Sequence, residues 1–512
     1  MRNEKTIIPF PFFSEEKDGF FKNDGKISFN VDDKISSSEK SFFHQFLEEV
    51  GFDLAKDSKN SKSINIKIKS DNKNNSLENK EAYTLEINEN EIDICASSVA
   101  GIFYALVSLK SLLLSDNEKI DCTFIYDKPE YEWRGFLLDT SRSFYSVEFI
   151  KKVLDLCAFH KMNRFHWHLT DDQGWRISIP EYPKLTEIGS KRFANTSPLS
   201  PDVGNSCNQE RVQFYTDDEI KEIVEYANNR NITIVPEIEL PGHSSALLSA
   251  YPEFGCKGES YKVENRWGIF EDVLCAGNDK IFDLYNAIFK TVSRLFPGKW
   301  IHIGGDECPT SMWEKCPKCQ ERIKKEGLSS TKQLQPWVTK KMVELVLSYE
   351  KTPIAWDEVI DNTEKSPVNK NVIVQSWRGV EGGEKAVKMN HKVIMSPQTL
   401  CYLNLKNINS DEEPGRLGFI TTKKAYSYTP ITSEMSKDCV DSVLGGECTF
   451  WSEEMPYSRI VEYMMFPRFC AISESLWLAE SKKDFKRFSS NVIEQKKRLS
   501  KLDTLFYDGK LD

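Results

Sequence analysis

The chain has 512 residues, of which 39% are hydrophobic and 29% are charged, and its formal net charge at pH 7 is −10. This length is too great for one ordinary core and predicts two or three domains, among which a large barrel would fit. An acidic chain with a pI near 5.5 and no basic stripe is not typical of a nucleic-acid-binding protein.

The N-terminus lacks the continuous apolar segment of a secretory signal, and no run of 18 apolar residues occurs. Thirteen cysteines, an odd number, favour reduced thiols over a disulfide framework. From these features we expect a cytoplasmic protein with neither a membrane nor a nucleic acid as partner.

Residues 1–128 contain short apolar segments that alternate like strands, followed by one helical segment. The expected strands are 26–31, 63–69, 82–87 and 91–96, and the expected helix is 98–114. No group of residues here has catalytic spacing. The sequence therefore predicts a small N-terminal α/β domain that supports the next one.

From Trp133 onward, short apolar runs alternate regularly with amphipathic helical segments. The expected strands are 134–139, 164–169, 233–238, 300–303, 352–356, 372–377, 392–395 and 441–445. Eight strands with helices between them indicate a (β/α)₈ TIM barrel, which we assign to residues 129–480. Residues 481–512 are expected to form a C-terminal helical segment that packs on the barrel, and the stretch 397–440 is expected to be an elaborated loop.

Polar and aromatic residues gather directly after these strands. They are Arg142, Asp171, Asp172, His243, Asp306, Glu307, Trp356, Trp377, Tyr402, Trp451 and Glu453. Because active sites of such barrels lie at the C-terminal ends of the strands, this distribution predicts one pocket.

The stretch 300–307 (WIHIGGDE) is the centre of this pattern. Neighbouring residues of a strand point to opposite faces, so the two glycines suggest a turn that lets Asp306 and Glu307 reach one cavity. Taken alone, the string is equally compatible with a strand that ends in two solvated acids.

Five motifs together resemble the β-N-acetylhexosaminidases of glycoside hydrolase family 20. They are residues 134–142 (RGFLLDTSR), 166–176 (HWHLTDDQGWR), 236–243 (PEIELPGH), 302–307 (HIGGDE) and 451–453 (WSE). The similarity extends from Lys128 to about Trp477, and the N-terminal unit is similar to the small domain that precedes the family's barrel.

The resemblance implies an exo-acting, retaining enzyme that removes terminal β-linked GlcNAc, with GalNAc left open, through an oxazolinium intermediate formed by the substrate's own acetamide. It implies that Glu307 is the general acid and base, that Asp306 holds the acetamide, and that His243 with Asp171 forms a relay behind the acid, Asp172 being the less certain of the two aspartates. The residues that it implies for substrate binding are Arg142, Trp356, Trp377, Tyr402, Asn404, Trp451 and Glu453.

Two positions depart from the family pattern. Asn404 stands where many relatives have Asp, which changes the polarity expected near C6 of the sugar. Arg416 stands where many relatives have a Trp that lines the leaving-group subsite. The sequence does not assign roles to His302, Glu237 and Glu239, for which packing and loop support are the simpler interpretations.

No catalytic metal or organic cofactor is expected, and the expected partner is an oligosaccharide or glycoconjugate that ends in an N-acetylhexosamine. Cys316-Pro-Lys-Cys319, with Cys308 nearby, has zinc-like spacing, but no fourth ligand is evident in the sequence.

Two alternative functions remain at this point. They are a non-catalytic sugar-binding protein on the same fold, which would be expected to lose Asp306 or Glu307, and an enzyme that releases a disaccharide.

Overall fold

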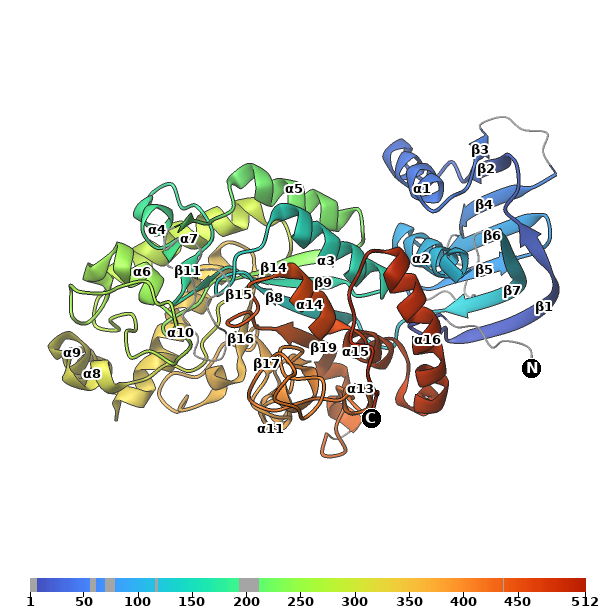
Figure 1. The fold of residues 1–512 in the computed structure, drawn as a ribbon. Helices are drawn as coiled ribbons and strands as arrows, with labels where there is room; N and C mark the ends of the chain where they lie inside the picture. The colour runs from blue at the N-terminus through green and yellow to red at the C-terminus, as the bar shows by residue number, and fades with distance from the viewer. Residues whose placement is uncertain (1–6, 56–60, 70–78, 116–117, 193–210, 436) are drawn as a thin grey trace.

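The computed structural model describes residues 7–55, 61–69, 79–115, 118–192, 211–435 and 437–512. It consists of a mixed sheet with two helices at the N-terminal side and a closed eight-stranded barrel that follows it (Figure 1). The predicted (β/α)₈ barrel preceded by a small α/β domain is therefore confirmed.

The N-terminal sheet has the strand order β1-β7-β5-β6-β4-β2-β3. Its strands are β1 (Phe13–Lys22), β2 (Ile27–Val31), β3 (Leu54–Ala55), β4 (Ser63–Ile68), β5 (Tyr83–Ile87), β6 (Glu91–Ala96) and β7 (Lys119–Asp127). Helix α1 (Ser37–Glu49) begins with a Ser36–Glu39 capping box, and α2 (Val99–Ser115) is buried along most of its length. The sequence did not predict β1, β7 or α1.

The barrel closes in the order β14-β15-β16-β17-β18-β19-β8-β9, and all of its neighbouring strands are parallel. The strands are β8 (Trp133–Asp139), β9 (Arg164–His168), β14 (Thr233–Glu237), β15 (Trp300–His302), β16 (Thr352–Trp356), β17 (Ile373–Ser376), β18 (Val393–Met395) and β19 (Val443–Phe450). Each of the eight predicted strands overlaps one of these.

Amphipathic helices surround the barrel, and shorter elements lie in the loops. The longer helices are α3 (Val147–Phe159), α5 (Asp217–Asn228), α7 (Lys280–Leu295), α10 (Leu334–Ser348), α11 (Glu381–Lys388), α14 (Ser458–Met465) and α15 (Arg468–Trp477). The short elements are β10 (Thr170–Asp171), β11 (Gly174–Trp175), β12 (Lys191–Arg192), β13 (Arg211–Val212), α4 (Lys184–Glu187), α6 (Ser245–Ala250), α8 (Ser311–Lys315), α9 (Pro317–Glu326), α12 (Gln398–Cys401) and α13 (Thr422–Tyr426). The predicted elaborated loop thus carries only two short α-helices in its described part.

The last helix, α16 (Phe485–Lys501), lies between the two units (Figure 1). Its Arg498 donates to Ser115 at the end of α2, while Gln495 is hydrogen-bonded to His160 of the barrel. The two units also share buried ion pairs, because Arg134 binds Glu81 and Lys161 binds Asp127. The N-terminal unit is therefore fixed to the barrel by charges as well as by packing.

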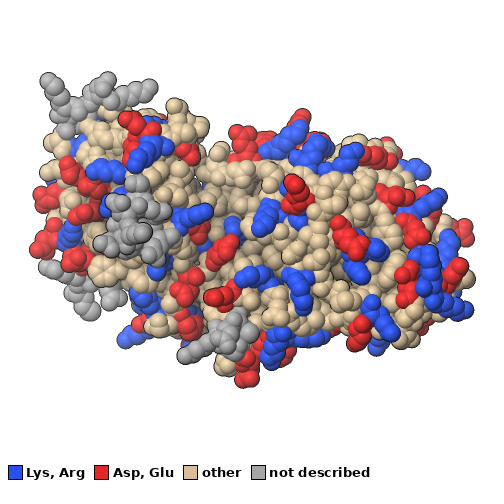
Figure 2. Space-filling view, turned by 180° about the vertical axis from the view of Figure 1, so that it is seen from behind, with Lys and Arg blue, Asp and Glu red and all other residues tan. Residues whose placement is uncertain are grey.

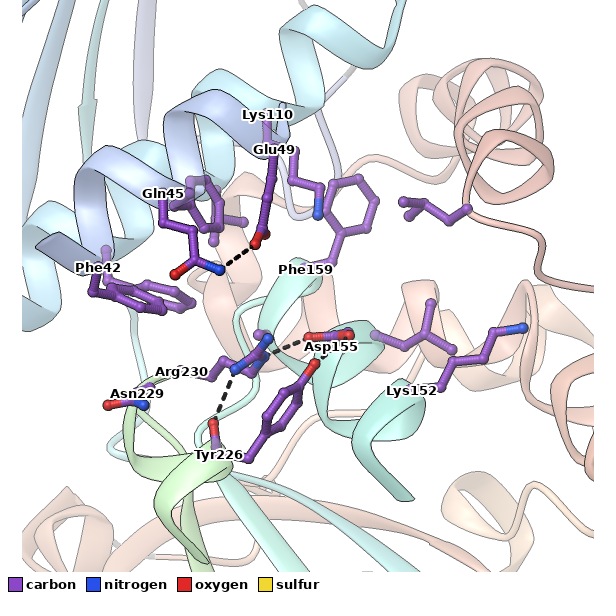
Figure 3. A pocket seen from close by; sticks show the side chains of 16 residues that line it. Phe42, Gln45, Glu49, Lys110, Lys152, Asp155, Phe159, Tyr226, Asn229 and Arg230 are labelled. Atoms are coloured by element: carbon purple, nitrogen blue, oxygen red, sulfur yellow. Dashed lines mark hydrogen bonds and ion pairs between the residues drawn. The ribbon is translucent and has the colours of Figure 1, made fainter. Parts of the chain in front are cut away.

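A cavity of about 450 Å³ at this boundary is lined by side chains from α1, α2, α3 and α5 (Figure 3). Asp155 in this cavity is bound by Arg230 and accepts a hydrogen bond from Tyr226, and Glu49 accepts one from Gln45. Its acids are thus already paired, so the cavity is not where we expect acid–base chemistry.

On the face shown in Figure 2, acidic and basic side chains are interspersed over the surface. Within the described ranges, none of the helices is both long enough and apolar enough to cross a membrane.

Candidate active site

A glycine turn follows the short strand β15 and carries the two acids. Gly304 and Gly305 have φ values of 59° and 103°, and Glu307 itself has a φ of 46°. A methyl group at Gly304 would lie 1.7 Å from Oε2 of Glu239, an oxygen that also accepts the Gly305 N–H. Only glycine fits this close approach, and the predicted turn is present.

The imidazole of His243 lies between two pairs of carboxylates. Its Nδ1 is 3.1 Å from Asp171 and 3.0 Å from Asp172, and its Nε2 is 3.6 Å from both Asp306 and Glu307. Burial disfavours the imidazolium, but the charges of Asp171 and Asp306 outweigh it and raise the pKa of His243 well above its usual value. His243 is therefore buried among acids whose charges favour its protonated form.

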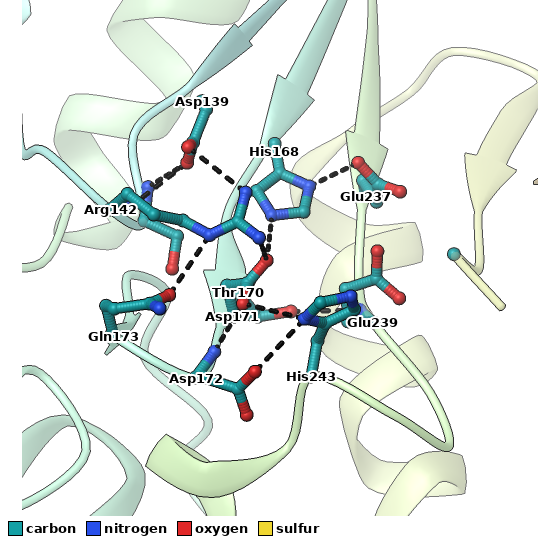
Figure 4. A network of polar contacts seen from close by, with 12 residues as sticks. Asp139, Arg142, His168, Thr170, Asp171, Asp172, Gln173, Glu237, Glu239 and His243 are labelled. Carbon is teal, nitrogen blue, oxygen red and sulfur yellow. Dashed lines mark hydrogen bonds and ion pairs between the residues drawn. The ribbon is translucent and has the colours of Figure 1, made fainter. Parts of the chain in front are cut away.

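A tight hairpin after β9 carries Asp171 and Asp172, the two acids on the Nδ1 side of His243 (Figure 4). Asp172 is fixed by the backbone N–H and the hydroxyl of Ser245. Asp171 accepts from His168 at 2.8 Å and binds Arg142 at 2.7 Å. The structure thus brings both aspartates to His243, and Asp172 makes the hydrogen bond to Nδ1 at least as closely as Asp171, the residue that the sequence favoured.

Arg142 is held on three sides, as Figure 4 shows. Besides Asp171, it lies 3.3 Å from Asp139 and donates through Nε to Gln173 at 3.0 Å. Burial opposes ionisation of Asp171, yet the guanidinium of Arg142 keeps the pKa of this carboxyl below its usual value. The guanidinium is thereby oriented before any ligand binds.

Four aromatic side chains form a continuous wall beside the acids. The ring centroids of Trp356 and Trp451 are 6.0 Å apart, those of Trp451 and Tyr402 are 6.2 Å apart, and those of Tyr402 and Trp377 are 6.4 Å apart. Such a wall can enclose an apolar group such as an acetamide methyl and exclude water from it. The Arg142 guanidinium also lies over Trp451, at 5.2 Å from the ring centroid.

The carboxyl group of Glu307 is partly exposed, and a cavity of about 510 Å³ adjoins it. Desolvation and the neighbouring Asp306 raise its pKa, and the charge of His243 opposes this shift in part. A carboxyl that holds its proton closer to neutral pH is suited to donate it.

The two acids differ in their hydrogen bonding. Oδ1 of Asp306 is buried, and in the described part of the chain nothing donates a hydrogen bond to it. An acceptor of this kind is available to an N–H group of a bound ligand.

Below the pocket, histidines and glutamates fill the barrel interior. Glu237 is bound by His166, His168 and His302 and accepts from Trp356 Nε1 at 2.9 Å. The roles that the sequence left open for Glu237 and His302 are thus contacts that orient Trp356 and the ends of β9 and β15. Glu239 is buried beside Asp306, and desolvation together with that charge raises its pKa well above the usual value.

Three further residues belong to the pocket but were not predicted. Glu358 accepts from Trp377 Nε1 at 3.0 Å, and desolvation followed by the charge of Asp306 raises its pKa to about 8. Asp139 and Gln173 bind Arg142. The available signals were the position of Glu358 two residues after β16 and the presence of Asp139 and Gln173 inside two of the motifs.

The remaining predicted residues lie in the loops around the pocket. Glu453 is partly buried, and desolvation raises its pKa against the charge of Arg142. Asn404 is partly buried, and no described residue is hydrogen-bonded to its Oδ1. The guanidinium of Arg416 lies 4.1 Å from the ring centroid of Trp267, and its Nε lies 3.5 Å from Glu454.

A pocket with neighbouring carboxylic acids beside an aromatic wall, placed at the C-terminal ends of barrel strands, defines a glycoside hydrolase. The chain belongs to glycosyl hydrolase family 20: the model of the family's catalytic domain matches residues 131–480, and that of the family's domain 2 matches residues 4–128.

The relatives agree with this assignment. A β-hexosaminidase of Porphyromonas gingivalis is 35% identical to this chain, and the match covers 94% of this chain and 62% of that protein. A β-hexosaminidase of Akkermansia muciniphila is 30% identical, and the match covers 82% of this chain and 84% of that protein. The crystal structure of an exo β-N-acetylglucosaminidase of family 20 from Vibrio harveyi, in complex with N-acetylglucosamine, is 27% identical and superimposes with a TM-score of 0.86 over 98% of this chain and 78% of that one.

Proposed function

We propose that this protein is an exo-acting, retaining β-N-acetylhexosaminidase that removes terminal β-linked GlcNAc by substrate-assisted catalysis. The observation that carries this proposal is the single turn that holds Asp306 and Glu307 together beside His243. A retaining enzyme with a protein nucleophile places its two carboxyl groups roughly 5–5.5 Å apart on opposite sides of the sugar. Neighbours on one turn are poorly placed for that task, so the nucleophile belongs to the substrate.

In the proposed first step, the acetamide oxygen at C2 attacks the anomeric carbon, and the glycosidic bond breaks. Asp306 accepts the acetamide N–H and stabilises the positive charge of the oxazolinium ion that forms. The buried Oδ1 without a donor supports this role. The aromatic wall around Tyr402, whose hydroxyl we assign to the acetamide oxygen, keeps water from the cyclising group.

Glu307 acts as general acid in this step and protonates the leaving oxygen. In the second step it acts as general base and activates the water that opens the oxazolinium ion with net retention. Its raised pKa and the cavity beside it, which is large enough for part of a leaving group, support the assignment.

His243 and the two aspartates behind it position the acids. An imidazolium 3.6 Å from both Asp306 and Glu307 limits their mutual repulsion, and Asp171 and Asp172 hold it in place. Arg142, oriented by Asp139 and Gln173, is assigned to the hydroxyls at C3 and C4, and Glu453 to those at C4 and C6. Asn404 is assigned to the surroundings of C6.

The decisive test compares two p-nitrophenyl substrates that differ only at C2. We expect rapid hydrolysis of the N-acetyl-β-glucosaminide, almost none of the β-glucoside, and strong inhibition by a thiazoline analogue of the intermediate. Comparable turnover of both substrates would mean that a protein carboxylate attacks. Brief treatment with EDTA is expected to leave the rate unchanged, because no step uses a metal.

The alternatives predict other outcomes. A sugar-binding protein without catalysis would bind GlcNAc and hydrolyse neither substrate. An enzyme that releases disaccharides would prefer an aryl disaccharide to the aryl monosaccharide, so analysis of the first product separates the two activities. The presence of both Asp306 and Glu307 favours an enzyme over a sugar-binding protein without catalysis.

A further inference from the structure

Four cysteines that the proposed catalysis does not use converge behind the loop that carries Glu307. They are Cys256, Cys275, Cys316 and Cys319, and each offers a sulfur within 4.8 Å of the other three. Cys256 is partly buried and the other three are buried. Cys308, which the sequence suggested as a companion of the CxxC pair, is not a member of this group.

The distances between the sulfurs fit a metal better than they fit disulfides. The pairs Cys256–Cys319, Cys275–Cys316 and Cys275–Cys319 are separated by 3.8, 3.7 and 3.7 Å. A disulfide needs about 2.05 Å. A regular tetrahedron with zinc–sulfur bonds of about 2.3 Å has sulfur–sulfur edges of about 3.8 Å.

The backbone of three separate segments is arranged around this group. Gly255 and Leu274 form an antiparallel bridge, and the Cys275 N–H donates to the Phe254 carbonyl at 2.8 Å, which places Cys256 and Cys275 side by side. Cys316 is the N-cap of α9 and Cys319 lies in its first turn. Thiolates are favoured at a helix N-terminus because the unpaired N–H groups there carry partial positive charge.

Gly277 lies at a close contact between two of these segments. A methyl group at this position would lie 2.3 Å from the carbonyl carbon of Lys318, a residue between Cys316 and Cys319. The loop before α7 and the CxxC turn therefore touch backbone to backbone.

We propose that these four cysteines bind one structural zinc ion. Four thiolates fill all positions of a tetrahedral ion, so no position is left for water or substrate, and an all-sulfur set of this spacing favours zinc among the common divalent metals. The site is independent of the glycosidase chemistry and adds a metal that the sequence did not predict.

The site has a structural consequence for the active site. Glu307, α8 and Cys316 belong to one connection between β15 and α9, and Trp313 in α8 donates to the Leu274 carbonyl at 2.8 Å. The ion thus fastens the loop of the general acid to the loop before α7. Loss of the ion is expected to loosen both loops together.

The test is the zinc content of the full-length protein, purified without added metal and measured by mass spectrometry of the digested sample. About one zinc ion per chain is expected for the wild type and for the control Cys308→Ser, whose cysteine lies in the same loop. Cys275→Ser and Cys319→Ser are expected to lose the metal, and their thermal midpoints are expected to fall by roughly 5 °C.

A second measurement on the wild type does not depend on whether the variants fold. Titration of the native protein with a mercurial, in the presence of a zinc-sensitive dye, should release zinc in step with the modification of four thiols. Growth with cobalt should give the visible absorption of a tetrahedral cobalt–thiolate centre. Zinc in the wild-type sample no higher than in a protein-free blank would overturn the proposal. So would a protein mass that is lower by the hydrogens lost when two disulfides form.

Discussion

At the scale of single residues, the pocket gives two adjacent acids different surroundings. Glu307 is partly exposed beside a cavity and has a raised pKa, whereas Asp306 is mostly buried and has one oxygen without a donor. The surroundings of a carboxyl group set its chemical role, so the acid proposed to donate a proton and the acid proposed to hold an N–H can be neighbours on one turn.

The first prediction separates these roles through the leaving group. Glu307→Gln should lower kcat/KM by about 10²–10⁴ for substrates with poor leaving groups and far less for activated aryl glycosides, because only the former need a proton. Asp306→Asn should lower kcat/KM for both classes, because oxazolinium formation suffers with any leaving group. A series of aryl N-acetylglucosaminides with different leaving-group pKa values provides the measurement. Equal losses across that series for Glu307→Gln would refute its role as the acid.

The second prediction concerns pH. Glu307 must be protonated to act as an acid, so kcat/KM should fall at high pH. The alkaline limb of this pH profile reports the pKa of Glu307 in the free enzyme. The charge of Asp306 raises this pKa and that of His243 lowers it. Asp306→Asn should therefore move the limb to lower pH and His243→Gln should move it to higher pH. Shifts of the same sign in both variants, measured with a substrate that has a poor leaving group, would contradict the assignment of the limb to Glu307.

At the scale of secondary-structure elements, the geometry of the turn after β15 depends on Gly304. We expect Gly304→Ala to lose at least about 10²-fold in kcat, because the new methyl group would displace Glu239 and with it the acids. Gly327, which ends α9, is a matched control: its φ of 64° is close to the 59° of Gly304, but no atom lies within 4 Å of an added methyl group. Gly327→Ala should cost about 1 kcal/mol of stability and leave kcat unchanged. Similar losses of kcat in both variants would show that backbone strain, rather than the contact with Glu239, is responsible.

The elements also show what a sequence can and cannot predict. The barrel strands could be predicted because each contains a short apolar segment and helical segments lie between them. Seven of the eight were predicted to within one residue at each end, whereas the eighth, predicted at 441–445, extends from Val443 to Phe450. Strand β1 (FSEEKDGFFK) is charged and mostly exposed, so it lacks that pattern and was missed. Helix α1 was missed although its capping box, Ser36 and Glu39, is readable in the sequence.

The residues of the candidate site could likewise be predicted where a local sequence pattern marks them. Asp306 and Glu307 could be placed because a strand, two glycines and two acids are contiguous. Three residues of the aromatic wall could be placed because Trp356 ends a strand and Trp377 and Trp451 directly follow one, whereas Tyr402 follows the short helix α12. The four-cysteine group could not be assembled, because Cys256 and Cys275 come from a loop whose path the sequence does not encode in any periodic pattern. The resemblance ranked Asp171 above Asp172 behind His243, but the structure places both close to its Nδ1. The roles of these residues in catalysis stay predictions.

At the scale of the whole molecule, the attachment of the N-terminal unit depends on buried charge. Lys161 and Asp127 are both almost fully inaccessible, and Asp127 also accepts from Tyr83 and Trp477. We expect Lys161→Met to destabilise the protein by about 3–5 kcal/mol, since it leaves a carboxylate buried without its cation. Adding Asp127→Asn should restore part of that loss.

Chemical denaturation measures both variants. The exposed pair Lys221 and Asp218 provides the control, because Lys221→Met should change the free energy of unfolding by no more than about 0.5 kcal/mol. A loss in Lys161→Met no larger than in this control would show that the pair of Lys161 and Asp127 does not help to hold the two units together.

The acceptor of Asp306 that meets no donor in the described part of the chain has a thermodynamic consequence for the resting enzyme. A buried polar atom left unsatisfied costs about 1–3 kcal/mol of folding free energy. The folded protein is therefore destabilised locally, and a ligand with a suitably placed N–H would remove this destabilisation by donating to the oxygen. An N-acetylated sugar should raise the melting temperature more than the same sugar without the acetamide. Asp306→Ala, which we expect to be inactive, should melt higher than the wild type. If this variant melts lower, the orphaned oxygen is not a source of instability. If it melts higher, the oxygen that we propose to hold the acetamide is also one that natural selection for stability alone would have removed.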